Sequence, residues 1–249
     1  MKRIHLLCLT AAIILTAACG GNRENTTAQT ASNDSTSLSL PGDSTLYGLA
    51  CDGCSDTIVV MLTNLDGAPD TFDILEASRQ HKVFGHPRVG DQIALVINPE
   101  DATIADLVIN LEQLKGTWCY LVKPTLRERA GITDSMRQEM TTRMPDSIRR
   151  RLMQPREYGF QLLANAQARP IGMERGSQSS RQQSPVVWPE IRPYRSWHLF
   201  NGRLVLTQRQ RDSLRTPPTD TADFVLLRRD TLVLRYNDGS RQGFYRKKK

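Results

Sequence analysis

Most of the chain after residue 44 consists of short stretches in which apolar and polar residues alternate or β-branched residues run together. A period of two places alternate side chains on one face of a strand, so these stretches predict β-strands rather than helices. Five such strands in about 65 residues are enough for a small closed or partly closed β-barrel. In residues 44–110 the predicted strands are 46–49, 57–62, 71–75, 92–97 and, as a strand or a short helix, 104–109.

A second set of alternating stretches fills residues 111–249 and predicts a second barrel. Asn201-Gly202 is the strongest hairpin signal in the chain, because both residue types accept the positive φ angles of a type I′ turn. Asn237-Asp-Gly239 is another. Consecutive strands joined by tight turns are typical of up-and-down barrels. The predicted strands, after one that begins near Gly116, are 158–163, 195–200, 203–206, 223–227, 231–236 and 242–245.

A helical insertion is expected at about 125–155, within the second barrel. Apolar residues recur there at every fourth position, close to the 3.6-residue period of a helix, which predicts one apolar stripe on one or two helices. Thr133 or Asp134 is expected to cap the helix, and Pro145 to break it. The stripe either packs over a face or mouth of the barrel, or forms an adaptable Met-rich lid or partner surface. Its members are Ile132, Met136, Met140, Met144, Ile148 and Leu152.

The first 18 residues have the pattern of a cleaved export signal. Lys2 and Arg3 precede an apolar run, 4–15, that is too short to span a bilayer and is followed by small residues. The sequence Leu-Thr-Ala-Ala-Cys19-Gly resembles the lipobox of bacterial lipoproteins, in which the cysteine is acylated. That resemblance implies a lipid anchor on Cys19, with residues 19–43 as a flexible polar tether.

The chain is basic, with 33 Lys and Arg residues against 26 Asp and Glu residues and a formal net charge of +7. Loss of Lys2 and Arg3 with the signal lowers the charge to +5. Nucleic-acid binding is not expected, since only 6% of the residues are aromatic and could stack on bases, and an exported lipoprotein rarely meets nucleic acid. We expect a basic surface that faces solvent or anionic lipid headgroups.

Two motifs resemble known β-barrel families. Gly48 and the later stretch Gly85-His-Pro-Arg-Val-Gly-Asp-Gln-Ile, with its Val-Gly-Asp turn, resemble OB-fold domains of envelope lipoproteins in the Bacteroidota. Gly116-Thr-Trp118 resembles the lipocalin and calycin signature, in which the tryptophan plugs the closed end of the barrel. The resemblances imply a mainly β protein with an OB-like barrel (44–110) followed by a lipocalin-like barrel (111–249).

The pair Cys51-Asp-Gly-Cys54 has three interpretations. Export to an oxidising compartment favours a disulfide that pins a short turn. Two thiolates with His81 and His86 would instead suit zinc or copper. A redox-active dithiol is disfavoured, because no helix follows that could lower a thiol pKa. The remaining mature cysteine, Cys119, has no obvious partner.

The residues around this pair resemble the opening of the NlpE family, outer-membrane lipoproteins linked to copper tolerance and envelope-stress sensing. Tyr47, Cys51, Cys54 and Ile58 match that family's motif, whereas Ala50 replaces its proline. The domain order also differs, since the pair opens the lipocalin-like domain in that family but lies in the OB-like region here. The resemblance implies a metal- or redox-responsive sensor as an alternative function.

The sequence lacks the nucleophile elbow, the Walker loop, the His-Glu-x-x-His motif and the dinucleotide fingerprint, so we do not expect an enzyme. The expected function is a non-catalytic binding module for a small hydrophobic or amphipathic ligand, or for an envelope protein partner. The residues after Cys19 lack the acidic run that resembles a surface-export signal in the Bacteroidota. We therefore expect an outer-membrane lipoprotein that faces the periplasm, with no cofactor apart from the copper or zinc alternative at Cys51 and Cys54.

Overall fold

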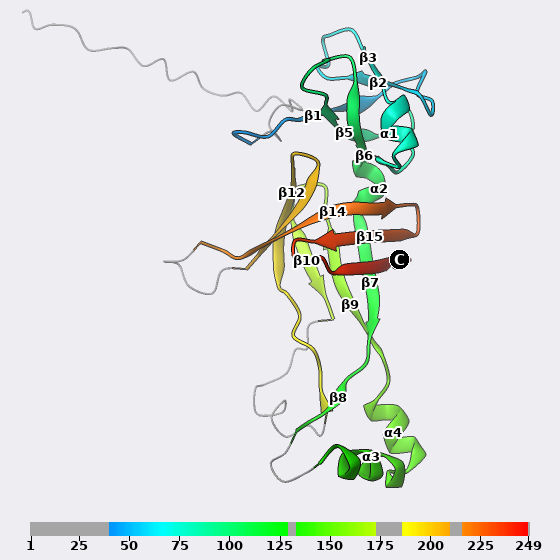
Figure 1. Ribbon diagram of the computed structural model, residues 1–249, viewed down its shortest axis with the longest axis vertical. Helices are drawn as coiled ribbons and strands as arrows, with labels where there is room; N and C mark the ends of the chain where they lie inside the picture. The colour runs from blue at the N-terminus through cyan, green and yellow to red at the C-terminus, as the bar shows by residue number, and fades with distance from the viewer. Residues whose placement is uncertain (1–39, 129–132, 173–185, 210–215, 249) are drawn as a thin grey trace, which may run out of the picture. The chain divides into compact units, whose positions relative to one another are not determined.

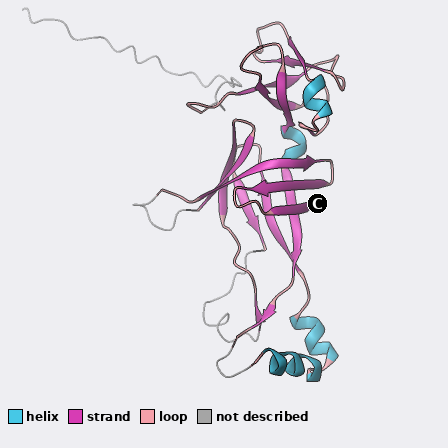
Figure 2. Cartoon of the chain, viewed as in Figure 1, coloured by secondary structure: helices cyan, strands magenta, loops and turns pink. Residues whose placement is uncertain are grey.

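The computed structural model describes residues 40–128, 133–172, 186–209 and 216–248, and all of them belong to one compact unit, Asp34–Lys249. The chain is mainly β, as predicted (Figure 2). Strands dominate because alternate side chains are apolar, so each strand can bury one face. Two sheets contain nearly all of the strands, and a two-stranded ribbon contains the rest.

The first sheet has six strands in the order β3-β2-β1-β5-β6-β4 (Figure 1). β1 pairs with both β2 and β5, and a parallel bridge between Asp73 and Ile104 joins the end of β3 to the chain just before β6. These pairings curl the sheet back on itself, as a small Greek-key barrel requires. The elements are β1 (Thr45–Ala50), β2 (Ile58–Leu62), β3 (Asp70–Asp73), α1 (Leu75–Arg79), β4 (Val83–Phe84), β5 (Gln92–Ile97) and β6 (Ala105–Asn110).

The second sheet has eight antiparallel strands in the order β10-β9-β7-β16-β15-β14-β13-β12. β12 to β16 follow one another as hairpins, which confirms the up-and-down prediction. A bridge between Gln167 and Ser196 links the two outer strands, so the barrel is nearly closed. The strands are β7 (Gly116–Val122), β9 (Arg156–Leu162), β10 (Ala168–Ile171), β12 (Tyr194–Phe200), β13 (Arg203–Gln208), β14 (Thr219–Leu227), β15 (Thr231–Tyr236) and β16 (Arg241–Arg246).

Asn110 marks the change from the first sheet to the second. Its side chain is fully buried and accepts a hydrogen bond from the Gln113 backbone N–H, which caps the short helix α2 (Leu111–Leu114). Its amide group donates to the His86 carbonyl and to Asp91 Oδ2, at 2.8 and 2.7 Å. A buried amide with all of these partners fixes where β6 ends and α2 begins.

The tip of the β12–β13 hairpin contacts the start of the first barrel. Asn201 and Gly202 both have positive φ, as the predicted type I′ turn requires. The Asn201 backbone N–H donates to Asp43 Oδ1 at 2.8 Å, and the Gly202 N–H donates to Thr45 Oγ1 at 3.2 Å. One hydrophobic cluster contains residues of both sheets, including Tyr47 of β1. The two sheets therefore share part of their core.

The insertion between β7 and β9 contains two helices and one strand of the two-stranded ribbon. Thr133 caps α3 (Asp134–Arg143), and Pro145 separates it from α4 (Asp146–Leu152), as the sequence predicted. The ribbon pairs β8 (Thr125–Leu126) with β11 (Val186–Val187). The first interpretation of the apolar stripe was that it packs over the barrel, but none of the described side chains of α3 and α4 is buried. The stripe is instead partly exposed, as a partner surface would be.

Candidate functional site

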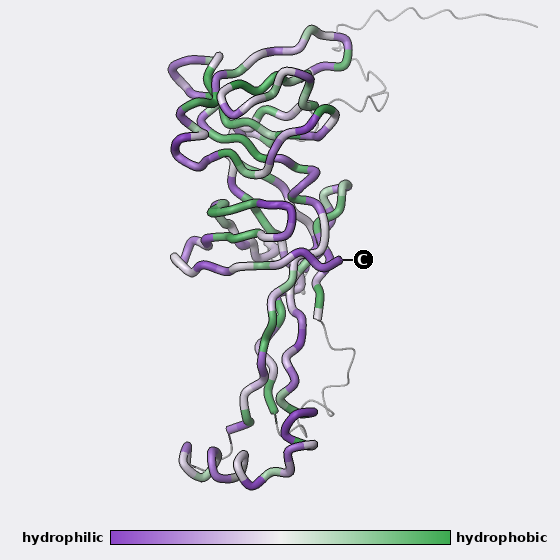
Figure 3. Tube along the Cα trace, turned by 90° about the vertical axis from the view of Figure 1, so that its right-hand side faces the viewer, coloured by the Kyte–Doolittle hydropathy of each residue, from purple (hydrophilic) through white to green (hydrophobic). Residues whose placement is uncertain are grey.

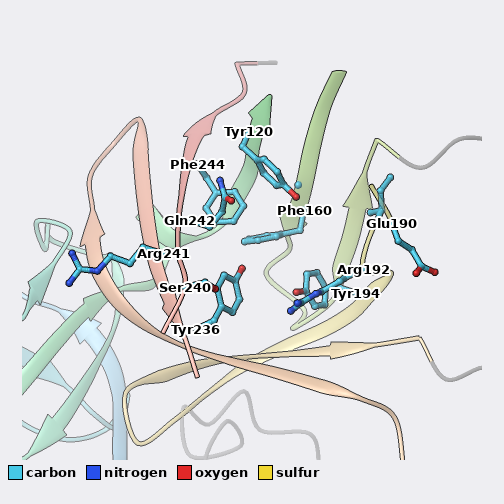
Figure 4. Close-up of a pocket in the computed structure, with 12 residues that line it drawn as sticks. Tyr120, Phe160, Glu190, Arg192, Tyr194, Tyr236, Ser240, Arg241, Gln242 and Phe244 are labelled. Atoms are coloured by element: carbon cyan, nitrogen blue, oxygen red, sulfur yellow. The ribbon is translucent and has the colours of Figure 1, made fainter. Parts of the chain in front are cut away.

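A cavity of about 310 Å³ opens at one end of the second barrel. This volume lies at the lower end of the range typical of small-molecule sites. Figure 4 shows its lining side chains, which come mainly from β7, β9, β12, β15 and β16. The complete lining is Tyr120, Gly159, Phe160, Glu190, Ile191, Arg192, Tyr194, Tyr236, Ser240, Arg241, Gln242 and Phe244.

Aromatic rings form much of the cavity wall. Tyr120 and Phe244 meet edge to face with ring centroids 5.4 Å apart, and Phe160 lies 5.1 Å from Phe244 and 5.9 Å from Tyr194. Ring pairs at these separations stabilise one another beyond the area that they bury. Tyr236 lies across the cavity from Phe244 (Figure 4). The wall therefore offers a rigid apolar surface to a flat or aliphatic ligand.

A polar cluster centred on Asp220 lies beside this wall. The Tyr194 hydroxyl and Gln208 Nε2 both donate to Asp220 Oδ2, at 2.7 and 3.2 Å, and Arg192 Nη1 lies 2.7 Å from Asp220 Oδ1. The Arg192 guanidinium also lies 5.9 Å from the ring of Tyr236. Because a guanidinium has five N–H donors, Arg192 retains donors for a ligand while it is paired with Asp220.

The tyrosine hydroxyls of the cavity stay protonated well above neutral pH. Burial raises the pKa of Tyr194, Tyr236 and Tyr120, and the negative charge of Asp220 adds to the effect on the first two. Neutral phenols act as hydrogen-bond donors and acceptors. The cavity thus combines an apolar wall with several polar groups, the arrangement that orients an amphipathic molecule.

The sequence analysis missed these residues, although a signal was present. On one face of three strands, a fully buried leucine or alanine is followed two positions away by a polar side chain. The pairs are Leu206 and Gln208, Ala222 and Asp220, and Leu234 and Tyr236. The same side of neighbouring strands thus changes from apolar to polar. Such a change inside a barrel indicates an open end.

Gly116 and Trp118, the predicted barrel signature, lie on β7 beside α2. Trp118 is fully buried, and its Nε1 donates to the Leu114 carbonyl at 2.7 Å. The Arg246 guanidinium lies over the Trp118 ring, 4.5 Å from its centroid, and donates to the carbonyls of Gln113 and Lys115. Gly116 has φ +140°, and a Cβ there would lie 2.5 Å from Arg246 Nη1. The glycine is needed because a larger residue would displace the arginine.

The run Arg246-Lys-Lys-Lys249 is of the kind that usually forms a solvated tail, but the structure does not place Arg246 in one. The end of β16 places it against Trp118, where burial lowers its pKa. Lys247 forms an ion pair with Glu157. Antiparallel pairing of β16 with β7 sets Arg246 opposite Trp118, a long-range register that a single sequence does not reveal.

Cys51 and Cys54 lie in the loop between β1 and β2, and both are half-buried free thiols. The Cys51 N–H donates to the Val60 carbonyl at 2.8 Å, and the Val60 N–H donates to Cys54 Sγ at 3.4 Å. These contacts hold the loop against β2 with the thiols reduced. A disulfide between them stays a prediction.

The structure does not bring the two histidines to the cysteine pair. Both histidines are exposed; His81 has φ +57° and follows α1, while the His86 carbonyl, rather than its ring, contacts Asn110. Among the described residues, no group of three or more His, Cys, Asp or Glu side chains could hold a metal ion. The four-ligand zinc or copper site considered from sequence is therefore not assembled.

Two further cysteines belong to the expected mature chain. Cys119 lies fully buried on β7, where burial raises its pKa and makes it a poor nucleophile. Cys19, the predicted lipidation site, lies outside the described residues, as do the signal peptide and most of the tether. No helix of the described chain is long and apolar enough to cross a bilayer.

No family model matches the chain, and no curated protein is similar enough to count as a relative. The chain is similar to a solved lipocalin-like protein from Bacteroides thetaiotaomicron at 17% identity, over 53% of this chain and 95% of that one. The TM-score of 0.28 is too low to support an argument, so the fold assignment rests on the strand pairings. Membership of the NlpE family has no support beyond the local motif.

Proposed function

We propose that the second barrel binds a small amphipathic ligand and that Cys19 anchors the protein to the periplasmic face of the outer membrane. The observation that carries the binding proposal is the cavity of about 310 Å³, with aromatic side chains on its wall and the Arg192–Asp220 cluster beside it. The apolar part of a ligand would pack on Tyr120, Phe160 and Phe244. Its polar group would accept hydrogen bonds from Arg192 and from the hydroxyls of Tyr120 and Tyr236.

Side-chain directions support one orientation of the ligand. Figure 4 shows Gln242 and Tyr236 directed into the cavity, whereas Arg241 and Glu190 point away from it. Arg192 is thus the charged side chain best placed to meet a ligand inside the cavity. A ligand that accepts hydrogen bonds or carries negative charge fits this end, because guanidinium groups donate and never accept.

A fluorescent amphipath tests the proposal. We expect dansyl-undecanoic acid to bind with enhanced and blue-shifted emission, and Gln242→Trp to abolish binding by filling the cavity. Gln161→Trp is the matched control, since Gln161 is a half-buried glutamine of β9 that does not line the cavity. Equal binding by both variants, or none by the wild type across a panel of amphipaths, would refute the proposal.

The anchor is tested separately from the cavity. Radiolabelled palmitate supplied to expressing cells is expected to label the wild-type chain and not Cys19→Ser, and only the wild type is expected to sediment with outer membranes. Intact cells treated with protease distinguish the two faces, because a periplasmic protein is protected until the outer membrane is opened. Digestion in intact cells would exclude the periplasmic placement.

A further inference from the structure

The segment between β7 and β9 is strongly basic, as is the C-terminal stretch 214–249. Residues 121–156 contain nine Lys and Arg residues against four Asp and Glu residues, a formal net charge of +5 within a chain whose total is +7. We call residues 121–128, 133–156 and 186–188 the basic arm. Figure 3 colours its two helices mainly hydrophilic, with isolated hydrophobic positions.

Four hydrophobic residues of the basic arm are exposed. Leu121, Met136, Ile148 and Val187 have exposed fractions of 63, 48, 42 and 38%, and they are four of the ten exposed large hydrophobic residues in the described chain. Exposed apolar residues mark a surface that is covered in use when they lie together, whereas single ones are common on any protein. On α4, three consecutive arginines, 149–151, stand between the exposed Ile148 and the half-buried Leu152.

The ion pairs of the arm leave its arginines solvated. Arg143 pairs with Glu139 and Arg149 with Asp146, both at 2.5 Å and both within one helix, and the Arg143 side chain remains 78% exposed. Arg150 and Arg151 are also exposed. Such arginines can rearrange around charged groups whose positions are not fixed.

We infer that the basic arm docks on a bilayer surface that contains anionic lipid headgroups. Interfacial segments combine basic residues with aliphatic side chains, so that the charges meet phosphates and the apolar groups enter the acyl boundary. α4 has this composition, whereas α3 has no distinct apolar face. The inference rests on the proposed lipid anchor for proximity. Residues 19–43, if extended, reach roughly 80 to 90 Å, and a tethered arm binds at high effective concentration.

Vesicle sedimentation of the unlipidated chain from Asp34 to Lys249 tests the inference. This segment is a compact unit that contains both hydrophobic clusters, so it does not need the anchor to fold. We expect it to bind vesicles of phosphatidylglycerol and phosphatidylcholine in low salt, to dissociate in high salt, and not to bind vesicles of phosphatidylcholine alone.

Arg150→Glu/Arg151→Glu is expected to lower partitioning by at least about tenfold, because two attractive charges become repulsive. Arg228→Glu/Arg229→Glu is the matched control, because it reverses two adjacent exposed arginines between β14 and β15 and changes the net charge by the same amount. Apart from the loss that the lower net charge causes, this variant should bind vesicles as the wild type does. Equal losses in both variants would mean that only the overall charge matters, and the inference would be wrong.

Two further outcomes would also overturn the inference. Absence of vesicle binding by a wild-type chain that still binds the dansyl probe would reject the arm and leave the barrel proposal intact. Binding of a poly-glutamate peptide at Arg150 and Arg151, without vesicle binding, would assign the arm to an acidic protein instead. Circular dichroism of the variants confirms that each is folded.

Discussion

Replacement of Arg246 by methionine should destabilise the fold more than any other change of an arginine at the surface of the second barrel. The side chain donates to the carbonyls of Gln113 and Lys115 and lies over Trp118. It therefore satisfies carbonyl groups at the end of α2 and covers the buried Trp118 ring. Methionine keeps most of the apolar stem and removes only the guanidinium.

The magnitude follows from these contacts. Hydrogen bonds from a charged group contribute about 1.5–3 kcal/mol each, and a guanidinium over an indole adds about 0.5–2 kcal/mol. Burial of the charge works against these gains, since Arg246 Nε is buried without an acceptor among the described residues. We expect a net loss of about 2–4 kcal/mol in the free energy of unfolding. For a unit of this size, that corresponds to about 5–15 °C in Tm.

Urea unfolding followed by far-ultraviolet circular dichroism measures the effect. Arg228→Met, at an exposed turn, is the control and should lie within about 0.5 kcal/mol of the wild type. Arg246→Lys should recover only part of the loss, because an ammonium cannot reach two carbonyls and stack on the ring together. A double-mutant cycle with Trp118→Phe should give a coupling of about 0.5–2 kcal/mol. If Arg246→Met matches the control and the coupling is absent, Arg246 does not stabilise the end beside α2.

Two other predictions concern titration and thiol reactivity. Burial raises the pKa of Tyr194 and Tyr236 above 10 in the folded chain, so the unfolded chain loses these protons first as the pH rises. The stabilisation that these two groups contribute is therefore complete below pH 10, and the free energy of unfolding decreases as the pH rises further. Tyr236→Phe should make the fall between pH 10.5 and 12 shallower by up to about 1.4 kcal/mol per pH unit, and equal slopes in urea titrations would contradict this. In reduced native protein, Ellman's reagent should label Cys51 and Cys54 quickly and the buried Cys119 only after unfolding. The variant Cys51→Ser/Cys54→Ser should therefore show no fast phase of labelling. Fast labelling of three thiols in the wild type would be inconsistent with the structure.

Local patterns in the sequence were sufficient for most of the strands and for their class. The period of two predicted β1, β5, β12 and β15 closely, and Asn201-Gly202 predicted a turn that the structure has. The five-residue helix α1 and the two-residue strand β4 were missed because elements this short show no period. Burial of the Met-rich stripe was one of two interpretations, and spacing alone could not decide between them, since the same period arises on a free helix.

The site was harder to predict than the fold because it depends on which strands become neighbours. Arg246 meets Trp118 only because the last strand pairs with the first strand of the barrel. Cys51 and Cys54, in contrast, attracted attention through their spacing, and the structure leaves them in a turn with no histidine beside them. Residue type and spacing suggest chemistry, but the pairing of distant strands decides which residues share a site.

The two ends of the second barrel differ in how their polar groups are satisfied, and this bears on the role of a ligand. At the end beside α2, Trp118 donates to the Leu114 carbonyl and Arg246 donates to the carbonyls of Gln113 and Lys115. At the open end, Asp220 already has Tyr194, Gln208 and Arg192 as partners. A half-buried carboxylate with such partners needs no ligand to satisfy it when the chain folds. The empty barrel should therefore be stable, and a ligand should add only the mass-action term set by its concentration and Kd.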